Sequence, residues 1–303
     1  MRGFLNIDKP TGMTSFDVVR AVRRAAGVKR VGHAGTLDPL ATGVLPVAIG
    51  GEATRLIDAL VGASKRYVAE VTLGAETTTD DSEGEVVASA DASEVTAAAV
   101  ASALETFVGT HAQLPPAYSA IKVAGVPAYR AARKGEAHDL ALRVVVAYAL
   151  TLVTFEAGRC VIEVHCGKGY YVRSLARDLG RMLGVYGHVS ALRRTAVGPF
   201  AIARAVPLAD AVSRLQAGDI ATMLHAPDAV LTDWPAVLLG SDDIIEVRLG
   251  RPVTPEPRLD VAPEATLRAR AYGPDGRLVA LVEPAEGRSW HPYRVFADET
   301  ASQ

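Results

Sequence analysis

The sequence predicts a mixed α/β fold of the α+β type, in which a largely antiparallel central sheet is flanked by helices and a small β-rich module follows. Two observations support this prediction. Segments of alternating apolar residues arrive in hairpins, and the amphipathic helical segments between them follow no strict β-α-β order. The chain of 303 residues is long enough for roughly two domains, which we expect at residues 1–235 and 240–303.

The first half of the chain is predicted to contain two helices and a strand around a glycine-rich loop. Residues 15–27 have helical periodicity, with Ser15 as the N-cap and a glycine at the end. The sequence VGHAGTLDPLATGVLP, residues 31–46, is predicted to be a loop. Alternation predicts a strand over 65–74, and an alanine-rich segment with a serine cap predicts a helix over 93–108.

The middle of the chain contains a long stretch without periodicity. Residues 110–142 mix prolines, small residues and charges, with at most a short helix at 128–134. Excursions of this length are usually binding loops or lids. Two strands within 143–169, joined at residues 156–159, and a helix over 170–184 are expected to follow.

The last part of the sequence predicts a change of architecture. Two helical stretches near 207–225 precede a proline-bearing segment at 232–240, which suggests a domain boundary. Beyond it lie the segments at 265–287 and 290–296, where a Gly-Pro-Asp-Gly turn at 273–276 joins two alternating strands, so a small β-rich module is expected.

The net charge of −2 conceals an uneven distribution of charge. A phosphate-binding face needs local positive charge, whatever the charge of the whole chain. Residues 76–94 contain no lysine or arginine and carry Glu76, Asp80, Asp81, Glu83, Glu85, Asp91 and Glu94. Residues 168–194 contain one carboxylate, Asp178, and carry Lys168, Arg173, Arg177, Arg181, Arg193 and Arg194.

The helix over 170–184 presents arginine at every fourth position, at 173, 177 and 181. Like charges at this spacing repel one another by a few tenths of a kcal/mol per pair, so an anionic partner is expected opposite them. A solvated face partly neutralised by Asp178 is the alternative. The buried face of the helix is predicted to consist of Leu175, Leu179, Met182 and Leu183.

Several classes of protein are disfavoured. The amino terminus carries Asp8, Lys9 and Pro10 where a signal peptide needs an apolar core, and no segment approaches the ~20 apolar residues of a membrane helix. We therefore expect a cytoplasmic protein. Cys160 and Cys166 would share one face of a strand, too far apart to bridge, and are expected to be buried and reduced. The histidines lack zinc-like spacing, so no metal site is predicted.

Asp38 is the one carboxylate in the glycine-rich loop, five residues after His33. It can initiate an Asp-Pro turn and bond its own backbone. A phosphate-cradling loop is a weaker alternative, because the Walker lysine and the G-x-G-x-x-G pattern are missing. The third possibility is a nucleophilic or acid–base carboxylate, kept ionised by backbone amides and a distant arginine.

The segment GHAGTLDPLATGVLPVAIGGEAT, residues 32–54, resembles the catalytic motif of the bacterial tRNA pseudouridine-55 synthases, the TruB family, apart from one extra glycine, Gly51. The resemblance extends almost continuously over about residues 4–200. The C-terminal segment is loosely similar to the PUA or PUA-like RNA-binding module of such enzymes. The other matching segments are NIDKPTGMTSFDVV, KRYVAEVTLGAETTTDDSEG, QLPPAYSAIKVAGVPAYRAARKGE, GKGYYVRSLARDLG and GHVSALRRTAVGPF.

The resemblance implies roles for individual residues. Asp38 corresponds to the catalytic aspartate and Tyr67 to a residue that lies against the target base. Arg173 is expected to form an ion pair with Asp38 and to keep it charged against the effect of burial. Leu192 and Tyr171 are expected to line the uracil pocket.

Three further residues match positions that help to prepare the site. His33 is similar to the residue that helps to extrude the flipped nucleotide or takes its place, and Lys9 and Pro10 match a motif that supports the catalytic loop. Tyr170 and Gly167 depart from the family pattern, which more often has a small hydroxyl residue and a serine there. These departures concern the shape of the pocket.

The implied reaction is isomerisation of uridine 55 in the T loop of tRNA to pseudouridine, by base flipping and without a cofactor. The expected partner is the T arm of tRNA, bound by a monomer, and residues 110–142 match a thumb-like insertion that closes on RNA. Substrate contacts are expected from Arg177, Arg181 and Arg193, and further phosphate contacts from Arg194, Arg20, Arg23, Arg24, Lys29 and Arg30.

Two other functions are considered. A non-catalytic tRNA-binding or tRNA-folding protein on the same scaffold would bind tRNA without modifying it, but the intact set of Asp38, Tyr67 and Arg173 argues against it. An enzyme that uses the glycine-rich loop for a nucleotide would bind ATP or NAD saturably.

Overall fold

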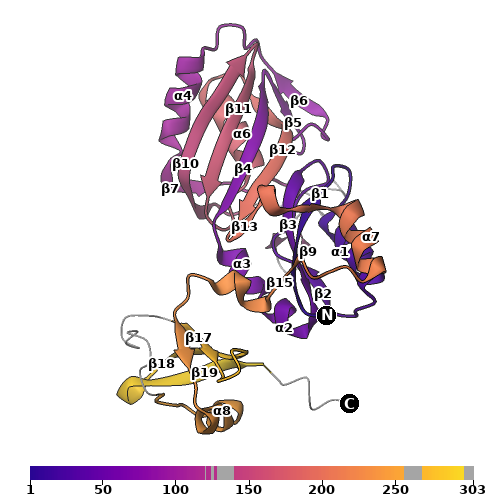
Figure 1. Cartoon of the computed structure of the whole chain (residues 1–303). Helices are drawn as coiled ribbons and strands as arrows, with labels where there is room; N and C mark the ends of the chain where they lie inside the picture. The colour runs from indigo at the N-terminus through magenta and orange to yellow at the C-terminus, as the bar shows by residue number, and fades with distance from the viewer. Residues whose placement is uncertain (120, 124–125, 128–139, 256–267, 297–303) are drawn as a thin grey trace. The chain divides into compact units, whose positions relative to one another are not determined.

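The chain divides into two compact units, Met1–His225 and Ala226–Gln303 (Figure 1). The division precedes the segment at 232–240 that was expected to separate the domains. This computed structural model describes residues 1–119, 121–123, 126–127, 140–255 and 268–296.

The first unit is built on one mixed sheet, which has eleven strands in the part of the chain that the structure describes. Most neighbours are antiparallel, and the pairs β1–β14 and β3–β12 are parallel, which confirms the predicted class. Strands β13 (Phe200–Ala201), β15 (Leu224–His225) and β2 (Val31–His33) pair with β12, β1 and β3. The main order is β14 (Val206–Pro207), β1 (Gly3–Lys9), β3 (Thr42–Ile49), β12 (Gly187–Val197), β4 (Lys65–Leu73), β11 (Arg159–Cys166), β10 (Arg143–Glu156) and β7 (Gly109–Gln113).

Helices pack on this sheet, and their apolar residues join those of the strands in one core. Helix α4 contacts β10 and α6 contacts β12, while α1 and α7 contact each other beside β1 (Figure 1). Two short hairpins pair β5 (Ala75–Thr77) with β6 (Val86–Ser89) and β8 (Lys122–Val123) with β9 (Val126–Pro127). The helices are α1 (Ser15–Ala26), α2 (Gly50–Arg55), α3 (Ile57–Gly62), α4 (Ala97–Thr106), α6 (Val172–Met182), α7 (Leu208–Ala217) and the 3₁₀ turn η1 (Ile202–Arg204).

The second unit has its own sheet and core. Its four strands run in the order β16 (Ala236–Leu238), β17 (Ala269–Tyr272), β18 (Leu278–Ala285) and β19 (Ser289–Val295). The predicted turn at 273–276 joins β17 to β18. Helix α8 (Ser241–Arg248) and the 3₁₀ turns η2 (Pro227–Leu231) and η4 (Glu286–Arg288) complete the unit.

Both predicted helix caps were wrong by a few residues. Thr14 caps α1, because its hydroxyl accepts from the Asp17 amide while the Asp17 carboxylate accepts from the Thr14 amide. The Ser15 hydroxyl instead exchanges two hydrogen bonds with the backbone of Leu37. Thr96 rather than Ser93 caps α4.

Other expectations also changed. The predicted loop at 31–46 is reduced to residues 34–41, because β2 and β3 occupy its ends. The excursion at 110–142 begins as the edge strand β7, and the expected helix at 128–134 lies outside the described residues. Only one helix, α7, forms within 207–225.

The helix over 170–184 also differs from the expectation in its buried face. Met182 is 53% exposed, whereas Arg173 and Arg177 are buried. Cys160 and Cys166 are buried and unpaired, as expected, and burial raises the pKa of Cys160 to about 11. In the described part of the chain, no helix is long and apolar enough to cross a membrane.

Candidate active site

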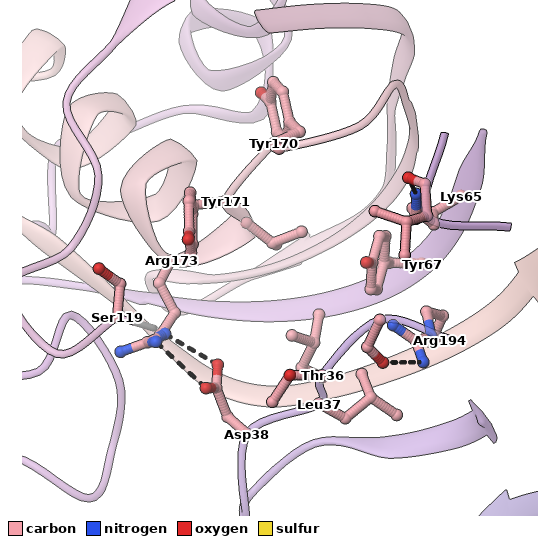
Figure 2. A pocket seen from close by; sticks show the side chains of 15 residues that line it. Thr36, Leu37, Asp38, Lys65, Tyr67, Ser119, Tyr170, Tyr171, Arg173 and Arg194 are labelled. Atoms are coloured by element: carbon pink, nitrogen blue, oxygen red, sulfur yellow. Dashed lines mark hydrogen bonds and ion pairs between the residues drawn. The ribbon is translucent and has the colours of Figure 1, made fainter. Parts of the chain in front are cut away.

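A pocket of about 260 Å³ opens in the first unit (Figure 2). Its walls come mainly from the loop at 34–41, strand β4, the start of α6 and strand β12, and Val61 of α3 and Ser119 complete them. Asp38 lies in this pocket with Tyr67, Tyr171, Arg173 and Leu192. The five residues predicted for catalysis and for the uracil pocket are therefore brought together by the fold.

The loop that carries Asp38 is fixed through its backbone carbonyl groups. The Ser15 hydroxyl donates to Leu37, the Lys9 ammonium group donates to Pro39 over 3.2 Å, and the Gly12 amide donates to Pro39 over 2.8 Å. The Thr11 hydroxyl and the Arg194 guanidinium bond two further carbonyl groups of the loop. The segment KPTGMTS thus holds the loop from one side, and strand β12 holds it from the other.

A glycine in this region allows two strands to approach each other closely. Gly43 has a φ of 101°, and a Cβ atom there would lie 2.2 Å from the carbonyl oxygen of Arg194. Because no other residue fits this position without moving β12, the glycine has a packing role at the start of β3. This packing explains one glycine of the motif without a bound nucleotide.

Asp38 and Arg173 form a two-pronged ion pair (Figure 2). The Arg173 Nε lies 3.0 Å from one carboxylate oxygen and its Nη2 lies 3.2 Å from the other. The Asp38 carbonyl also accepts from the Ala41 amide in a turn. The predicted Asp-Pro turn is therefore present, while the side chain is turned toward Arg173.

Arg173 is held in place by groups other than Asp38. Its guanidinium donates to the carbonyl oxygens of Thr79, over 2.8 Å, and Tyr118, over 2.9 Å. A second carboxylate, that of Asp81, lies 3.5 Å away and is itself bonded by the Thr79 hydroxyl. The side chain of Arg173 is only 5% exposed, so these contacts leave its guanidinium one orientation, toward Asp38.

Burial raises the pKa of Asp38 above the usual value for an aspartate. The positive charge of Arg173 opposes this effect and the negative charge of Asp81 adds to it. The expectation that Arg173 offsets burial is thus only partly right, because desolvation is the largest contribution. The result is a more basic carboxylate than one in water.

Tyr67 faces the same cavity from β4 (Figure 2). Burial raises the pKa of its hydroxyl, which therefore stays neutral at physiological pH. Beside it, the ammonium group of Lys65 donates to the carbonyl oxygens of Val61 and Ala63, both over 2.7 Å. Burial lowers the pKa of Lys65 to about 8. An aromatic ring thus forms one wall of the cavity, with a buried cation next to it.

Comparisons with known proteins identify the family. The model of the TruB family pseudouridylate synthase N-terminal domain matches residues 23–172, and that of the tRNA pseudouridylate synthase B C-terminal domain matches 173–226. Two proteins named tRNA pseudouridine synthase B, from Arthrobacter sp. and Dehalococcoides mccartyi, are 43% and 39% identical to this chain. Each alignment covers 98% of this chain and 97% of the relative.

The chain belongs to the TruB family of pseudouridylate synthases. A structure described as a Cbf5-Nop10-Gar1 complex is also similar, with a TM-score of 0.74 and 26% identity over 98% of this chain and 86% of that one. The ion pair of the TruB pocket joins the two matched regions, because Asp38 lies in the first and Arg173 begins the second.

Two predicted residues of the TruB motifs lie near the pocket without being among the residues that line it. Lys9 is fully buried under the loop at 34–41, where burial lowers its pKa to about 8 and the charge of Asp38 opposes that shift. His33 lies at the end of β2, and its Nδ1 is buried without a hydrogen-bond partner. Burial lowers the pKa of His33, so the ring favours the neutral form.

The arginines predicted to bind substrate are placed differently. Arg177 is 5% exposed and bonds Asp80, Asp178 and the carbonyl oxygen of Leu114. Internal partners therefore occupy all three nitrogens of its guanidinium, which favours a structural role, and its contact with substrate stays a prediction. The two remaining arginines are Arg181, whose guanidinium lies 2.5 and 2.8 Å from the Glu76 carboxylate, and Arg193, which pairs with Asp8 over 2.7 Å.

The acidic partners of α6 were missed as site residues. Glu76, Asp80 and Asp81 belong to the acidic segment at 76–94, which the sequence showed without indicating its place. The regular spacing of the arginines on α6 predicted an anionic neighbour, and this spacing was the one sequence signal that pointed to these acidic partners. Ser119 and Arg194, which also line the pocket, were not assigned to it in advance.

Proposed function

We propose that this TruB-family chain isomerises uridine 55 in the T loop of tRNA to pseudouridine, with Asp38 as the catalytic aspartate. One observation carries the proposal: a carboxylate of raised pKa is fixed by a buried arginine at the wall of a pocket that also presents an aromatic ring. Family membership supplies the reaction.

The chemistry requires a base that is detached, turned and reattached without escaping. The C1′–N1 bond breaks, a C1′–C5 bond forms, and the hydrogen of C5 leaves as a proton while N1 gains one, so no redox partner takes part. Asp38 can attack C1′, add to the uracil ring or remove the C2′ proton. Each route needs an ionised carboxylate, and the Arg173 charge favours that form.

The other pocket residues hold the base. Flipping a stacked nucleotide costs a few kcal/mol, which stacking on Tyr67 and contact with Leu192 would offset. Arg194 donates to Val44 and Gly35 behind this wall, so the pocket keeps its shape while the uracil turns. We assign to Lys9 the role of supporting the catalytic loop. His33 is assigned the role of filling the space that the flipped nucleotide vacates.

The proposal includes the partner and the roles of other segments. The chain acts as a cytoplasmic monomer on the T arm of tRNA, and the insertion at 110–142 closes on it. Arg173 and Arg177 bond carbonyl oxygens of Tyr118 and Leu114, so the beginning of this insertion is tied to α6. The second unit serves as a PUA-like RNA-binding module.

The test measures tritium released from C5 of uridine in tRNA transcripts. Asp38→Asn is expected to abolish release, because the amide can neither attack nor accept a proton; Asp58→Asn, an exposed carboxylate on α3, is the control. Wild-type rates with Asp38→Asn would overturn the catalytic assignment. Equal tritium release from a transcript without uridine 55 would overturn the assignment of uridine 55 as the target. Binding of tRNA without any tritium release would favour the non-catalytic alternative.

A further inference from the structure

An exposed line of side chains follows one face of α1. Phe16, Arg20 and Arg24 occur at every fourth position, so they lie along the same side of the helix. All three are exposed, and Phe16, at 60%, presents an aromatic ring to water. We call these residues, together with Lys29 and Arg30 beyond the helix, the α1 stripe.

The positive charge of the α1 stripe is largely uncompensated. Arg20 pairs with Asp17 over 2.7 Å. Within the described ranges, Arg24, Lys29 and Arg30 form no ion pair with a carboxylate, and all three are exposed. The stripe therefore has an excess of cations at neutral pH, and its charges face water.

A hollow of about 290 Å³ runs beside the stripe. It is lined by Met13, Asp17, Arg20, Ala21 and Arg24, so its wall combines apolar side chains with two guanidinium groups and one carboxylate, which pairs with Arg20. This surface offers a cation, an apolar floor and an exposed aromatic ring within two turns of one helix. Single-stranded RNA presents the matching groups, which are phosphates and the faces of unpaired bases.

The stripe begins beside the catalytic loop. Ser15, next to Phe16, exchanges hydrogen bonds with the backbone of Leu37, the residue before Asp38. The Gly12 amide bonds the carbonyl oxygen of Pro39, the residue after it. The first turn of α1 and the segment just before it are thus attached to the catalytic loop on both sides of Asp38. An RNA strand that places one nucleotide in the pocket would meet this turn with its neighbouring nucleotides.

We infer that the α1 stripe binds the sugar-phosphate backbone that flanks the flipped uridine, with Phe16 stacked on a neighbouring base. This inference rests on the proposed function, because it takes RNA to be the substrate. Arg24 and Lys29 supply the phosphate contacts, and Phe16 supplies a contact that salt does not screen. The stripe determines the affinity for RNA and leaves the chemical step to the pocket.

The first test measures the dissociation constant of the full-length protein for a tRNA transcript at several salt concentrations. Arg24→Gln with Lys29→Gln is expected to raise Kd about 10-fold and to reduce the slope of log Kd against log salt by about 1 to 2. The control is Arg214→Gln on α7, which removes a positive charge that is half-buried and paired with Asp219. An unchanged Kd and slope in the double variant would overturn the inference.

The second test separates stacking from charge. Phe16→Ala is expected to raise Kd about 10-fold without changing the salt slope, and Phe16→Tyr to restore the wild-type affinity. Equal affinities of the alanine and tyrosine variants would overturn the stacking contact. Thermal unfolding of each variant confirms that the fold is intact.

These results can be told apart from those for the proposed function. If wild-type protein binds tRNA but releases no tritium, the proposed function fails while the binding comparison still decides the role of the stripe. If tritium is released normally and the stripe variants bind tRNA like wild type, only the inference about α1 fails.

Discussion

Helices α6 and α1 both carry residues at every fourth position along one face, and both faces contain arginine. On α6 each arginine meets a carboxylate: Arg173 meets Asp38 and Asp81, Arg177 meets Asp80, and Arg181 meets Glu76. On α1, among the residues that the structure describes, only Arg20 has an acidic partner, Asp17 of its own helix.

The difference arises from what packs opposite each helix. Strand β5 and the acidic turn that follows it provide the carboxylates that compensate the charges of α6, so this region builds the candidate active site. The arginine face of α1 meets water, so its charges remain available to a ligand. The same spacing therefore serves internal structure in one helix and, by our inference, recognition in the other. The following predictions test this contrast, from the largest expected effect to the smallest.

Substitution of Arg173, at the start of α6, is expected to have the largest effect. Arg173→Met leaves Asp38 and Asp81 near each other without a counter-charge, and removal of one partner of a buried pair costs about 3–5 kcal/mol. We expect the single-turnover rate of tritium release to fall by about 100- to 1,000-fold. Arg173→Lys keeps the charge but loses the two-pronged contact, so its rate is expected to lie between those of wild type and Arg173→Met.

A rate of Arg173→Met within about threefold of wild type would show that the ion pair does not support catalysis. In that case Arg173, the first arginine of α6, would be no more involved in the reaction than the arginines of α1.

The middle of the α6 arginines is expected to affect stability. Arg177→Met leaves Asp80 buried without its partner and should lower the free energy of unfolding, measured with urea, by about 3–5 kcal/mol. Adding Asp80→Asn should recover part of this loss, because it removes the carboxylate that was left without its partner. Asparagine also tolerates the positive φ of 59° at this position.

The matched control for this prediction is Arg181→Gln, at the more exposed end of the same face. Its side chain is 50% exposed, so loss of the Glu76 pair should change stability by less than about 1 kcal/mol. Equal losses from Arg177→Met and Arg181→Gln would mean that burial does not distinguish the two pairs.

The smallest effect concerns pH. Burial raises the pKa of Asp80 to about 6, above its value of 3.8 in the unfolded chain. As pH rises between these values the unfolded chain releases its proton first, so Asp80 lowers stability by up to about 3 kcal/mol across this window. Asp80→Asn should remove this part of the pH dependence, measured by urea unfolding at a series of pH values. A profile that the substitution leaves unchanged would show that Asp80 does not titrate in this way.

The sequence predicted the elements whose pattern is local. The strand at 65–74, the hairpin around 156–159 and the helix at 170–184 all form, because periodicity and turn residues decide them. The helix caps and the ends of the loop at 31–46 were wrong. In those places a contact with a distant residue, such as Ser15 with Leu37 or β2 with β3, competes with the local preference.

The candidate site was predictable to the extent that its residues stand in motifs. Asp38, Tyr67, Tyr171, Arg173 and Leu192 were named in advance, and the structure places them around one pocket. Arg177 was predicted to contact substrate, whereas the structure pairs it with the buried carboxylate of Asp80. From the sequence, a regular row of arginines looks the same whether it faces phosphates or buried carboxylates.

By itself the sequence indicated the class of the fold, five residues of the pocket and an anionic partner opposite the arginines of α6 as one of two possibilities. Only the tertiary structure decided which anions these are and which cations remain free. The reason is physical: the spacing of charges along a helix is set by its own residues, whereas the compensation of those charges depends on segments that only folding brings within a few ångströms.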